Sequence, residues 1–260
     1  MMRIGSYQLV RLLGEGGMAK VYEARRGDEP PVALKVFALA ADESRFLRER
    51  FASEGRLLAG LHHPRLVKVF ESGFDETTES LYYAMELVRD RKGRSSTLRD
   101  VGARGDVTEA RADVWYGDLC DVLSYCHARG VVHRDVTLGN VLLDAADHAV
   151  LADFGVSRIL NPALKKDLGV ASTFVTGQTA GTRPVMGSYW FLASEVRRGA
   201  AATPASDGYA LGVLFFRLLT GMWYEPSPFA FDLLAPYDPI WRVRLAALLS
   251  EDPTKRTYVP

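Results

Sequence analysis

The sequence predicts a two-lobed α+β fold, in which a small antiparallel β-sheet with one helix precedes a larger, mainly helical part. Three observations support this prediction. The first third of the chain carries short apolar runs separated by glycine- or proline-bearing turns, a pattern typical of strands. From Thr97 onward, apolar residues recur at helical spacing instead. With 260 residues, the chain is also long enough for two lobes.

Five short segments are predicted to be strands, because each is apolar in pattern and bounded by turn residues. They are residues 7–13, 20–26, 32–38, 66–72 and 81–85. Together they predict an antiparallel sheet of about five strands.

One amphipathic helix is predicted over residues 44–61, between the third and fourth strands. Glu54 falls on its apolar face, where a carboxylate is costly unless it has a partner. Pro64 is expected to end the helix. The apolar face is formed by Leu47, Phe51, Leu58 and Leu61.

Three longer helices are predicted in the second part, over residues 108–128, 205–219 and 240–250. Thr108 is a plausible cap for the first, while Gly130 and Gly221 are stop signals for the first and second. Between them, residues 161–183 are rich in Ser, Thr, Gly and Lys and predict a long, functional loop.

Composition indicates a soluble, cytoplasmic protein. Thirty-two basic residues balance thirty-two acidic ones, which gives no reason to expect nucleic acid or an anionic membrane as a partner. Cys120 and Cys126 lack zinc-ligand spacing and are interpreted as small core residues in a reducing compartment. The start of the sequence does not resemble a signal peptide, and the longest apolar stretch, residues 211–223, is too short to span a bilayer.

A glycine-rich turn between the first two strands is the first candidate site. Residues 14–21 read Gly-Glu-Gly-Gly-Met-Ala-Lys-Val, and glycines let the backbone approach a polyphosphate and donate amides to it. The alternative is a simple hairpin turn. The turn precedes a strand, so it is not the dinucleotide-binding fingerprint, which precedes a helix.

Three further motifs follow in order. Lys35 lies in an apolar strand, where the commoner case is a lysine that only faces solvent. Residues 133–140 read His-Arg-Asp-Val-Thr-Leu-Gly-Asn, and residues 153–155 read Asp-Phe-Gly. In this order and spacing, the motifs resemble the catalytic domain of Hanks-type (eukaryotic-like) bacterial serine/threonine protein kinases.

The resemblance implies the protein kinase fold, ATP and Mg as cofactors, and a role for each motif. Lys35 would hold the α- and β-phosphates and pair with Glu54. Asp135 would accept or orient the proton of the substrate hydroxyl, and Asn140 with Asp153 would bind Mg²⁺. His133 would be a buried packing residue rather than a metal ligand or base.

The nucleotide would bind between the lobes. Leu13, Val21, Ala33 and Leu142 would enclose the adenine, Met85 would close the back of the pocket, and the backbone from Glu86 to Val88 would offer hydrogen bonds. The phosphates would lie under Gly14, Glu15, Gly16, Gly17, Met18 and Ala19.

The resemblance covers residues 7–256 and divides them into an N-lobe (7–86), a hinge (86–96) and a C-lobe (97–256). Residues 187–195 resemble the peptide-docking loop, with Ser194 in place of proline, and Ser188 favours Ser/Thr acceptors. Asp207 and Gly212 match the large central helix, and Arg256 in the closing motif should pair with Glu195.

Two positions depart from the family pattern. The family's serine/threonine members carry a lysine where this chain has Thr137, and its tyrosine-specific members carry an arginine near Gly139. A hydrogen bond to a charged group contributes about 1.5–3 kcal/mol, so its loss would slow transfer roughly ten- to 150-fold. Residues 220–252 are also short for the family, which leaves substrate docking open.

Regulation by phosphorylation is a further expectation. Arg134 would form an ion pair with a phosphorylated residue of the activation loop, and a homodimer would allow autophosphorylation in trans. The candidate acceptors are Ser172, Thr173, Thr176, Thr179 and Thr182. The alternative is that these hydroxyls belong only to a solvated linker.

Two other functions stay open at this point. Thr137 and the short C-lobe would suit a nucleotide-binding pseudokinase or scaffold with little transfer activity. A small-molecule phosphotransferase would share the Asp-Asn and Asp motifs, but Arg134, residues 154–155 and the Glu195/Arg256 pair favour a protein substrate.

Overall fold

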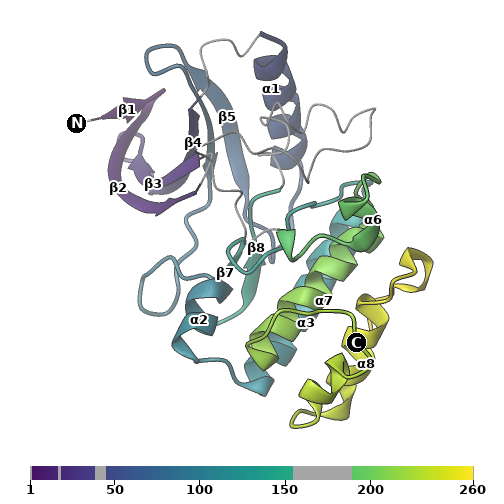
Figure 1. The fold of residues 1–260 in the computed structure, drawn as a ribbon. Coiled ribbons are helices and arrows are strands. Elements are labelled where there is room, and N and C mark those ends of the chain that lie inside the picture. The colour runs from purple at the N-terminus through teal and green to yellow at the C-terminus, as the bar shows by residue number, and fades with distance from the viewer. Residues whose placement is uncertain (1, 17–18, 39–44, 155–188, 260) are drawn as a thin grey trace, which may run out of the picture.

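The computed structural model describes residues 2–16, 19–38, 45–154 and 189–259. A strongly curved antiparallel sheet with helix α1 beside it forms one lobe, and a helical lobe lies below it (Figure 1). The predicted two-lobed α+β class is confirmed.

The sheet has six strands in the order β1-β2-β3-β4-β6-β5, and every pairing is antiparallel. Consecutive strands pair except where α1 separates β4 from β5, and there β6 inserts next to β4. The strands are β1 (Arg3–Ile4), β2 (Tyr7–Glu15), β3 (Ala19–Arg25), β4 (Val32–Ala38), β5 (Val69–Asp75) and β6 (Ser80–Met85).

Two details of the predicted sheet were wrong. The short edge strand β1 makes six strands where about five were expected. The strand predicted at residues 66–72 begins only at Val69, because the residues before it bond to the other lobe. Leu66 forms an isolated bridge with Leu151, and the Val67 N–H donates to the Leu151 carbonyl at 2.8 Å.

Helix α1 (Arg45–Ala59) lies along β5 and packs an aromatic side chain into the sheet. The Phe51 ring is buried and stacks on the Tyr83 ring of β6, with 4.2 Å between the ring centroids. The prediction that Pro64 ends this helix was wrong. The helix ends at Ala59, where the Gly60 N–H is shared between the carbonyls of Arg56 and Leu57.

The lower lobe consists of helices around a short hairpin. The α-helices are α2 (Leu98–Arg104), α3 (Glu109–His127), α6 (Ser194–Arg197), α7 (Pro204–Thr220) and α8 (Pro239–Leu248). The hairpin pairs β7 (Val141–Leu143) with β8 (Ala149–Leu151), and two 3-10 turns are η2 (Ala230–Leu234) and η3 (Pro253–Lys255). Thr108 caps α3 and Gly221 ends α7 in the left-handed conformation, as predicted. Residues 161–183 lie outside the described residues.

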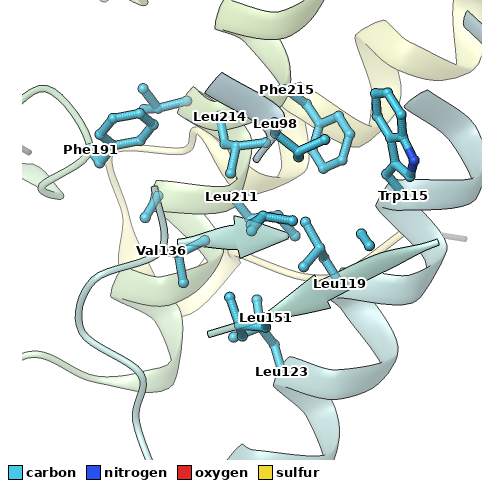
Figure 2. Packing of buried hydrophobic residues seen from close by; sticks show 14 of the residues in the cluster. Leu98, Trp115, Leu119, Leu123, Val136, Leu151, Phe191, Leu211, Leu214 and Phe215 are labelled. Carbon is cyan, nitrogen blue, oxygen red and sulfur yellow. The ribbon is translucent and has the colours of Figure 1, made fainter. Parts of the chain in front are cut away.

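The core of this lobe forms where α3 and α7 meet (Figure 2). Leu119 from α3 and Leu211 from α7 are fully buried there, and burial of one such side chain stabilises the fold by about 1.5–3 kcal/mol. Cys126 of α3 is buried and Cys120 partly so, and both are free thiols. Burial raises the pKa of Cys126 to about 11 and that of Cys120 to about 12, so both act as small core residues.

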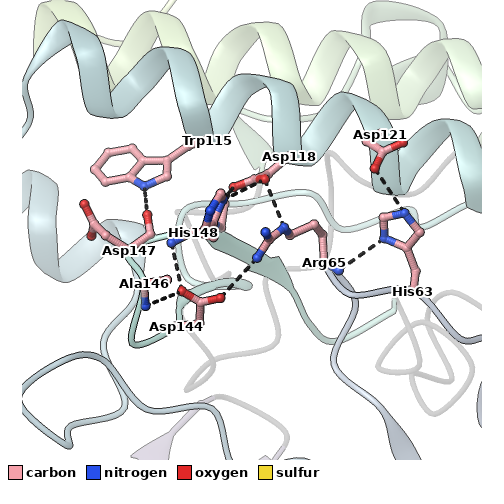
Figure 3. A network of polar contacts seen from close by, with 10 residues as sticks. His63, Arg65, Trp115, Asp118, Asp121, Asp144, Ala146, Asp147 and His148 are labelled. Carbon is pink, nitrogen blue, oxygen red and sulfur yellow. Dashed lines mark hydrogen bonds and ion pairs between the residues drawn. The ribbon is translucent and has the colours of Figure 1, made fainter.

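A polar network fastens the segment between α1 and β5, residues 62–67, to the lower lobe (Figure 3). Arg65 reaches Asp118 of α3 at 3.0 Å and Asp144 of the β7–β8 turn at 3.1 Å. His63 lies 3.2 Å from Asp121, and the Asp144 carboxylate also accepts the His148 N–H. The network therefore fixes the hairpin whose two ends lead to Asn140 and Asp153.

In the part of the chain that the structure describes, none of the helices has both the length and the apolar character needed to cross a bilayer.

Candidate active site

The loop that carries Asp135 is held by one buried carboxylate of α7. Asp207 is 1% exposed and accepts hydrogen bonds from two consecutive backbone N–H groups, those of His133 at 2.7 Å and Arg134 at 2.8 Å. Arg134 and Asp153 both have left-handed backbones, with φ of 69° and 60°. Such conformations are costly for residues other than glycine and are found preferentially at functional sites.

His133 is fully buried below this loop. Its Nε2 lies 3.0 Å from the Ala152 carbonyl oxygen, its Nδ1 accepts the Asp135 N–H at 3.3 Å, and its ring packs on Phe154. Burial lowers the pKa of His133 even though Asp207 and Asp135 act in the opposite direction. His133 is therefore a neutral packing residue, as the resemblance implied.

Asp135 and Asn140 are joined directly. The Asn140 Nδ2 donates to both the carbonyl and the carboxylate Oδ2 of Asp135, each at 2.8 Å. The Asn140 carbonyl accepts the Ala152 N–H at 2.8 Å. The backbone of Asn140 is therefore bonded to the residue that immediately precedes Asp153. Because its nitrogen donates to Asp135, the Asn140 side chain has its oxygen available as a metal ligand.

The β4 lysine and Asp153 form an ion pair across the lobes. Lys35 Nζ lies 3.0 Å from Asp153 Oδ1, and both side chains are mostly buried. Burial, and after it the nearby charge of Glu54, raises the pKa of Tyr83, which faces Lys35 in the β4–β6 register. Glu54 thus lies on α1 close to this pair, and its own pairing with Lys35 stays a prediction.

These residues have the donor atoms that Mg²⁺ prefers, which are hard oxygens. The Asn140 side-chain oxygen and the second carboxylate oxygen of Asp153 are the two candidate ligands from the chain. Phosphate oxygens and waters would complete the shell, as is usual for this ion. The donor set therefore fits Mg²⁺.

An apolar cluster lines the space between the lobes. The four residues predicted to enclose the adenine belong to it, as do Met85 and Val88 of the predicted pocket back and hinge; the four are Leu13, Val21, Ala33 and Leu142. The sequence prediction missed Val67, Val69, Val150 and Ala152, which belong to the same cluster. No periodicity could have indicated Val150, because β8 has only three residues and all of them are buried, whereas Val67 comes from the segment wrongly predicted as strand.

The backbone from Glu86 to Val88 leaves particular groups available. The Glu86 N–H donates to the Lys68 carbonyl at 2.8 Å, and the Val88 carbonyl accepts the Ser95 hydroxyl at 3.0 Å. Within the described residues, the Glu86 carbonyl and the Val88 N–H are not bonded to other groups. One acceptor and one donor therefore remain for a ligand.

The glycine-rich turn joins β2 to β3. Gly14 and Glu15 end β2, and the Gly16 N–H donates to the carbonyl of Ala19, the first residue of β3, at 2.9 Å. Gly17 and Met18 lie outside the described residues, as do Gly155 and residues 172–188 of the predicted activation loop.

The predicted pair under the docking loop is confirmed. Arg256 donates to both carboxylate oxygens of Glu195, at 2.5 and 2.9 Å, and its side chain is almost fully buried. An open pocket lies next to Asp135, and it is lined by Phe191, Ala193, Val196 and Asp207. The segment with Phe191 and Ala193 therefore lies beside the loop that carries Asp135.

Comparison with known proteins identifies the family to which this arrangement belongs. A curled sheet above a helical lobe, with a lysine and an aspartate paired between them, is the two-lobed kinase fold. The chain belongs to the protein kinase domain family, whose model matches residues 7–229. The resemblance to Hanks-type bacterial serine/threonine kinases is thereby confirmed.

Three relatives illustrate the likeness. Serine/threonine-protein kinase PknJ of Mycobacterium tuberculosis is 36% identical over 86% of this chain and 35% of its own length. PknB of the same organism is 36% identical over 87% of this chain and 33% of its own length. PrkC of Bacillus subtilis is 33% identical over 84% of this chain and 31% of its own length. The chain thus spans about a third of the length of these curated relatives.

A solved structure shares the fold. The crystal structure of the Mycobacterium tuberculosis PknI kinase domain superposes with a TM-score of 0.70 at 24% identity, covering 98% of this chain and 92% of that one.

Proposed function

We propose that this chain transfers the γ-phosphate of ATP, with Mg²⁺, to serine or threonine hydroxyls of proteins. The observation that carries this proposal is the direct hydrogen bond between Asp135 and Asn140 beside the Lys35–Asp153 ion pair. In the reaction, the bond between the γ-phosphorus and the β–γ bridging oxygen breaks as the acceptor oxygen binds the phosphorus. ADP leaves, and the hydroxyl proton passes to Asp135 or to solvent.

Each polar residue has a position that suits one task. Asp135 is held by the Asn140 amide so that its carboxylate can orient the acceptor hydroxyl. Asn140 and Asp153 would hold the metal, which neutralises charge on the phosphates. Lys35, released from Asp153 when nucleotide binds, would contact the α- and β-phosphates, with Glu54 as its partner.

The apolar cluster supports ATP as the phosphate donor. Ala33 and Leu142 come from opposite lobes and belong to the same cluster, which suits the two faces of a flat purine ring. The free Glu86 carbonyl and Val88 N–H match the donor and acceptor of the adenine edge. The turn with Gly14, Glu15, Gly16, Gly17, Met18 and Ala19 would cover the phosphates.

A protein substrate is supported by the docking segment. The buried pair of Glu195 and Arg256 holds this segment beside Asp135, which gives a polypeptide acceptor a surface to lie on. We assign residues 7–86, 86–96 and 97–256 to N-lobe, hinge and C-lobe. The free thiols of Cys120 and Cys126 support a reducing cytoplasm, and we keep homodimers and loop autophosphorylation as parts of the proposal.

The test is transfer of labelled phosphate from ATP with Mg²⁺ to the chain itself and to a generic basic protein. We expect incorporation that disappears in Asp135→Asn, because the amide cannot accept the hydroxyl proton and is otherwise the same size. Asp28→Asn, at an exposed position between β3 and β4, is the matched control and should transfer normally. Equal incorporation by wild type and Asp135→Asn, or none by either, would overturn the proposal.

A further inference from the structure

Helix α2 is docked directly on the catalytic loop. The backbone N–H of Arg99, in the first turn of α2, donates to the Leu138 carbonyl at 3.0 Å. Just before the helix, the Ser96 carbonyl accepts the Leu143 N–H at 3.0 Å, and Thr97 forms an isolated bridge with Leu142. These contacts fix the position of the Arg99 Cα relative to the loop between Asp135 and Asn140.

The Arg99 guanidinium lies over Gly139 and fills the space of its missing side chain. A methyl group on the Gly139 Cα would lie 2.5 Å from Nη2 and 2.8 Å from Cζ of Arg99. Gly139 does not have the left-handed backbone that favours glycine, so its backbone conformation is open to other residues. What glycine provides here is room for the guanidinium.

The charge of Arg99 is available to a ligand. The residue is exposed, and among the described residues no carboxylate lies within ion-pair distance of its guanidinium. Its neighbour Asp100 bonds back to the N–H of Thr97 at 2.8 Å, as part of the helix cap. An arginine without an anionic partner beside a phosphate-transfer site is well suited to hold a phosphoryl group with two parallel hydrogen bonds.

The neighbouring loop residues show why a cation is needed there. Thr137 is 3% exposed and carries no charge, and Gly139 has no side chain, so the loop itself supplies no cation at either position. Gly139 precedes Asn140, whose amide bonds to the Asp135 carboxylate. The Arg99 guanidinium therefore lies over the residue that precedes Asn140, one of the two residues assigned to Mg²⁺.

We propose that Arg99 of α2 supplies the cation that contacts the transferring γ-phosphoryl group, in place of a catalytic-loop lysine. The inference rests on the proposed function. It assigns a catalytic role to a residue outside every motif of the site, brought there by the docking of α2 on the loop.

The test compares Arg99→Ala and Arg99→Lys with Arg104→Ala, a control on the same helix whose arginine pairs with Asp106 at 3.0 Å. We expect Arg99→Ala to lower kcat roughly ten- to 150-fold with little change in KM for the protein acceptor. Arg99→Lys should retain part of the rate, and Arg104→Ala should match wild type. An unchanged kcat in Arg99→Ala, or a rise in the acceptor KM alone, would overturn the proposal.

Moving the positive charge from position 99 to position 139 provides the second measurement. In Arg99→Ala/Gly139→Arg, the new side chain starts from the space that Arg99 vacates, and we expect kcat to recover at least several-fold over Arg99→Ala. A double variant no faster than Arg99→Ala/Gly139→Ala, in which no cation returns, would count against a role for charge at this place.

Binding separates this proposal from the proposed function. Affinities for a non-hydrolysable ATP analogue and for ADP, both with Mg²⁺, are measured for wild type, Arg99→Ala and Arg104→Ala. We expect Arg99→Ala alone to weaken the analogue several-fold more than ADP, because only the analogue has a γ-phosphate. This ratio decides the role of Arg99 even if wild type transfers no phosphate, and an unchanged ratio would overturn it.

Discussion

Two buried polar side chains hold the backbone on which Asp135 stands. Asp207 accepts the consecutive N–H groups of His133 and Arg134, which stabilises the left-handed conformation of Arg134. His133 uses one ring nitrogen to donate and the other to accept, an arrangement that requires the neutral imidazole. A proton on its Nδ1 would face the Asp135 N–H, donor against donor.

Stability should therefore depend on the protonation of His133. Burial lowers its pKa below the ordinary 6.5, so below about pH 6.5 the unfolded chain binds a proton that the folded chain does not. The free energy of unfolding should then fall by up to about 1.4 kcal/mol per pH unit as the pH drops through this window. In His133→Phe this slope should be smaller, as measured by urea unfolding at pH 7.5, 6.0 and 5.0. Equal slopes in both proteins would contradict the assignment.

At this scale the motifs named residues that the structure brings together, Asp135 with Asn140 and Lys35 with Asp153, because each motif fixes its residues by local order along the chain. They did not predict contacts between distant segments. The bond between His133 and Asp207 joins residues 74 positions apart, and the Arg99–Gly139 contact depends on how α2 docks. The Lys35–Asp153 pair likewise arises only where the two lobes meet.

The packing of α1 against the sheet depends on one small residue. Gly55 follows Glu54 and faces β5, where a methyl group on it would lie 2.5 Å from Cβ of Ser72 and 3.0 Å from the Tyr83 ring. Gly117, in the middle of α3, is exposed and would have nothing within 4 Å of such a methyl group. The two glycines therefore serve different purposes in two otherwise regular helices.

Opposite effects are expected when each is replaced by alanine. Gly117→Ala should stabilise the chain by about 0.5–1 kcal/mol, because alanine restricts the unfolded backbone and favours helix. Gly55→Ala gains the same term but forces α1 away from β5, and the net result should be a loss of about 1–3 kcal/mol. Thermal and urea unfolding measure both. A stabilised Gly55→Ala would show that α1 is not held closely to the sheet.

Elements with a strong local pattern were predicted, and those formed by contact between lobes were not. The long helices α3 and α7 carry caps and stop signals in the sequence, and their predicted bounds agree with the structure within one or two residues. The strands β7 and β8 have three residues each, which is too short for periodicity to be recognised. The start of β5 was misplaced because Leu66 and Val67 bond to β8, outside the sheet.

Across the whole molecule, one buried ion pair connects the docking segment to the end of the chain. Arg256 binds Glu195 through two hydrogen bonds, and its guanidinium also lies over the Tyr209 ring of α7 at 4.9 Å. Burial alone would raise the pKa of Glu195, but the hydrogen bond and charge of Arg256 outweigh it and hold that pKa below the ordinary 4.5. A carboxylate with a lowered pKa stabilises the fold above pH 4.5 and loses this effect as the pH falls through its folded value.

Removal of the pair should destabilise the whole chain. Arg256→Ala leaves Glu195 without its partner and should cost about 3–5 kcal/mol at pH 7. The difference from wild type should narrow below pH 4.5. Lys255→Ala is the matched control, because its exposed ammonium lies 3.8 Å from Asp252 and should contribute no more than about 1 kcal/mol. Chemical unfolding of the three proteins measures these losses of unfolding free energy. Equal losses in the two variants would contradict the expected difference.

The fastening of residues 62–67 to the lower lobe determines how the two lobes can tilt. The His62 N–H donates to the Tyr125 hydroxyl of α3 at 2.9 Å, and the Arg65 carbonyl accepts the Leu151 N–H at 2.8 Å, so this segment moves with the helices although it leads into the sheet. The sheet can therefore rotate about this segment, which lies beside β5. The β2–β3 turn begins three strands farther along, about 15 Å at the usual strand spacing, and so has a longer lever arm than β4. A small rotation of the sheet about this segment would therefore carry the β2–β3 end of the cleft through a larger arc than β4, which bears Lys35 and lies two strands from β5.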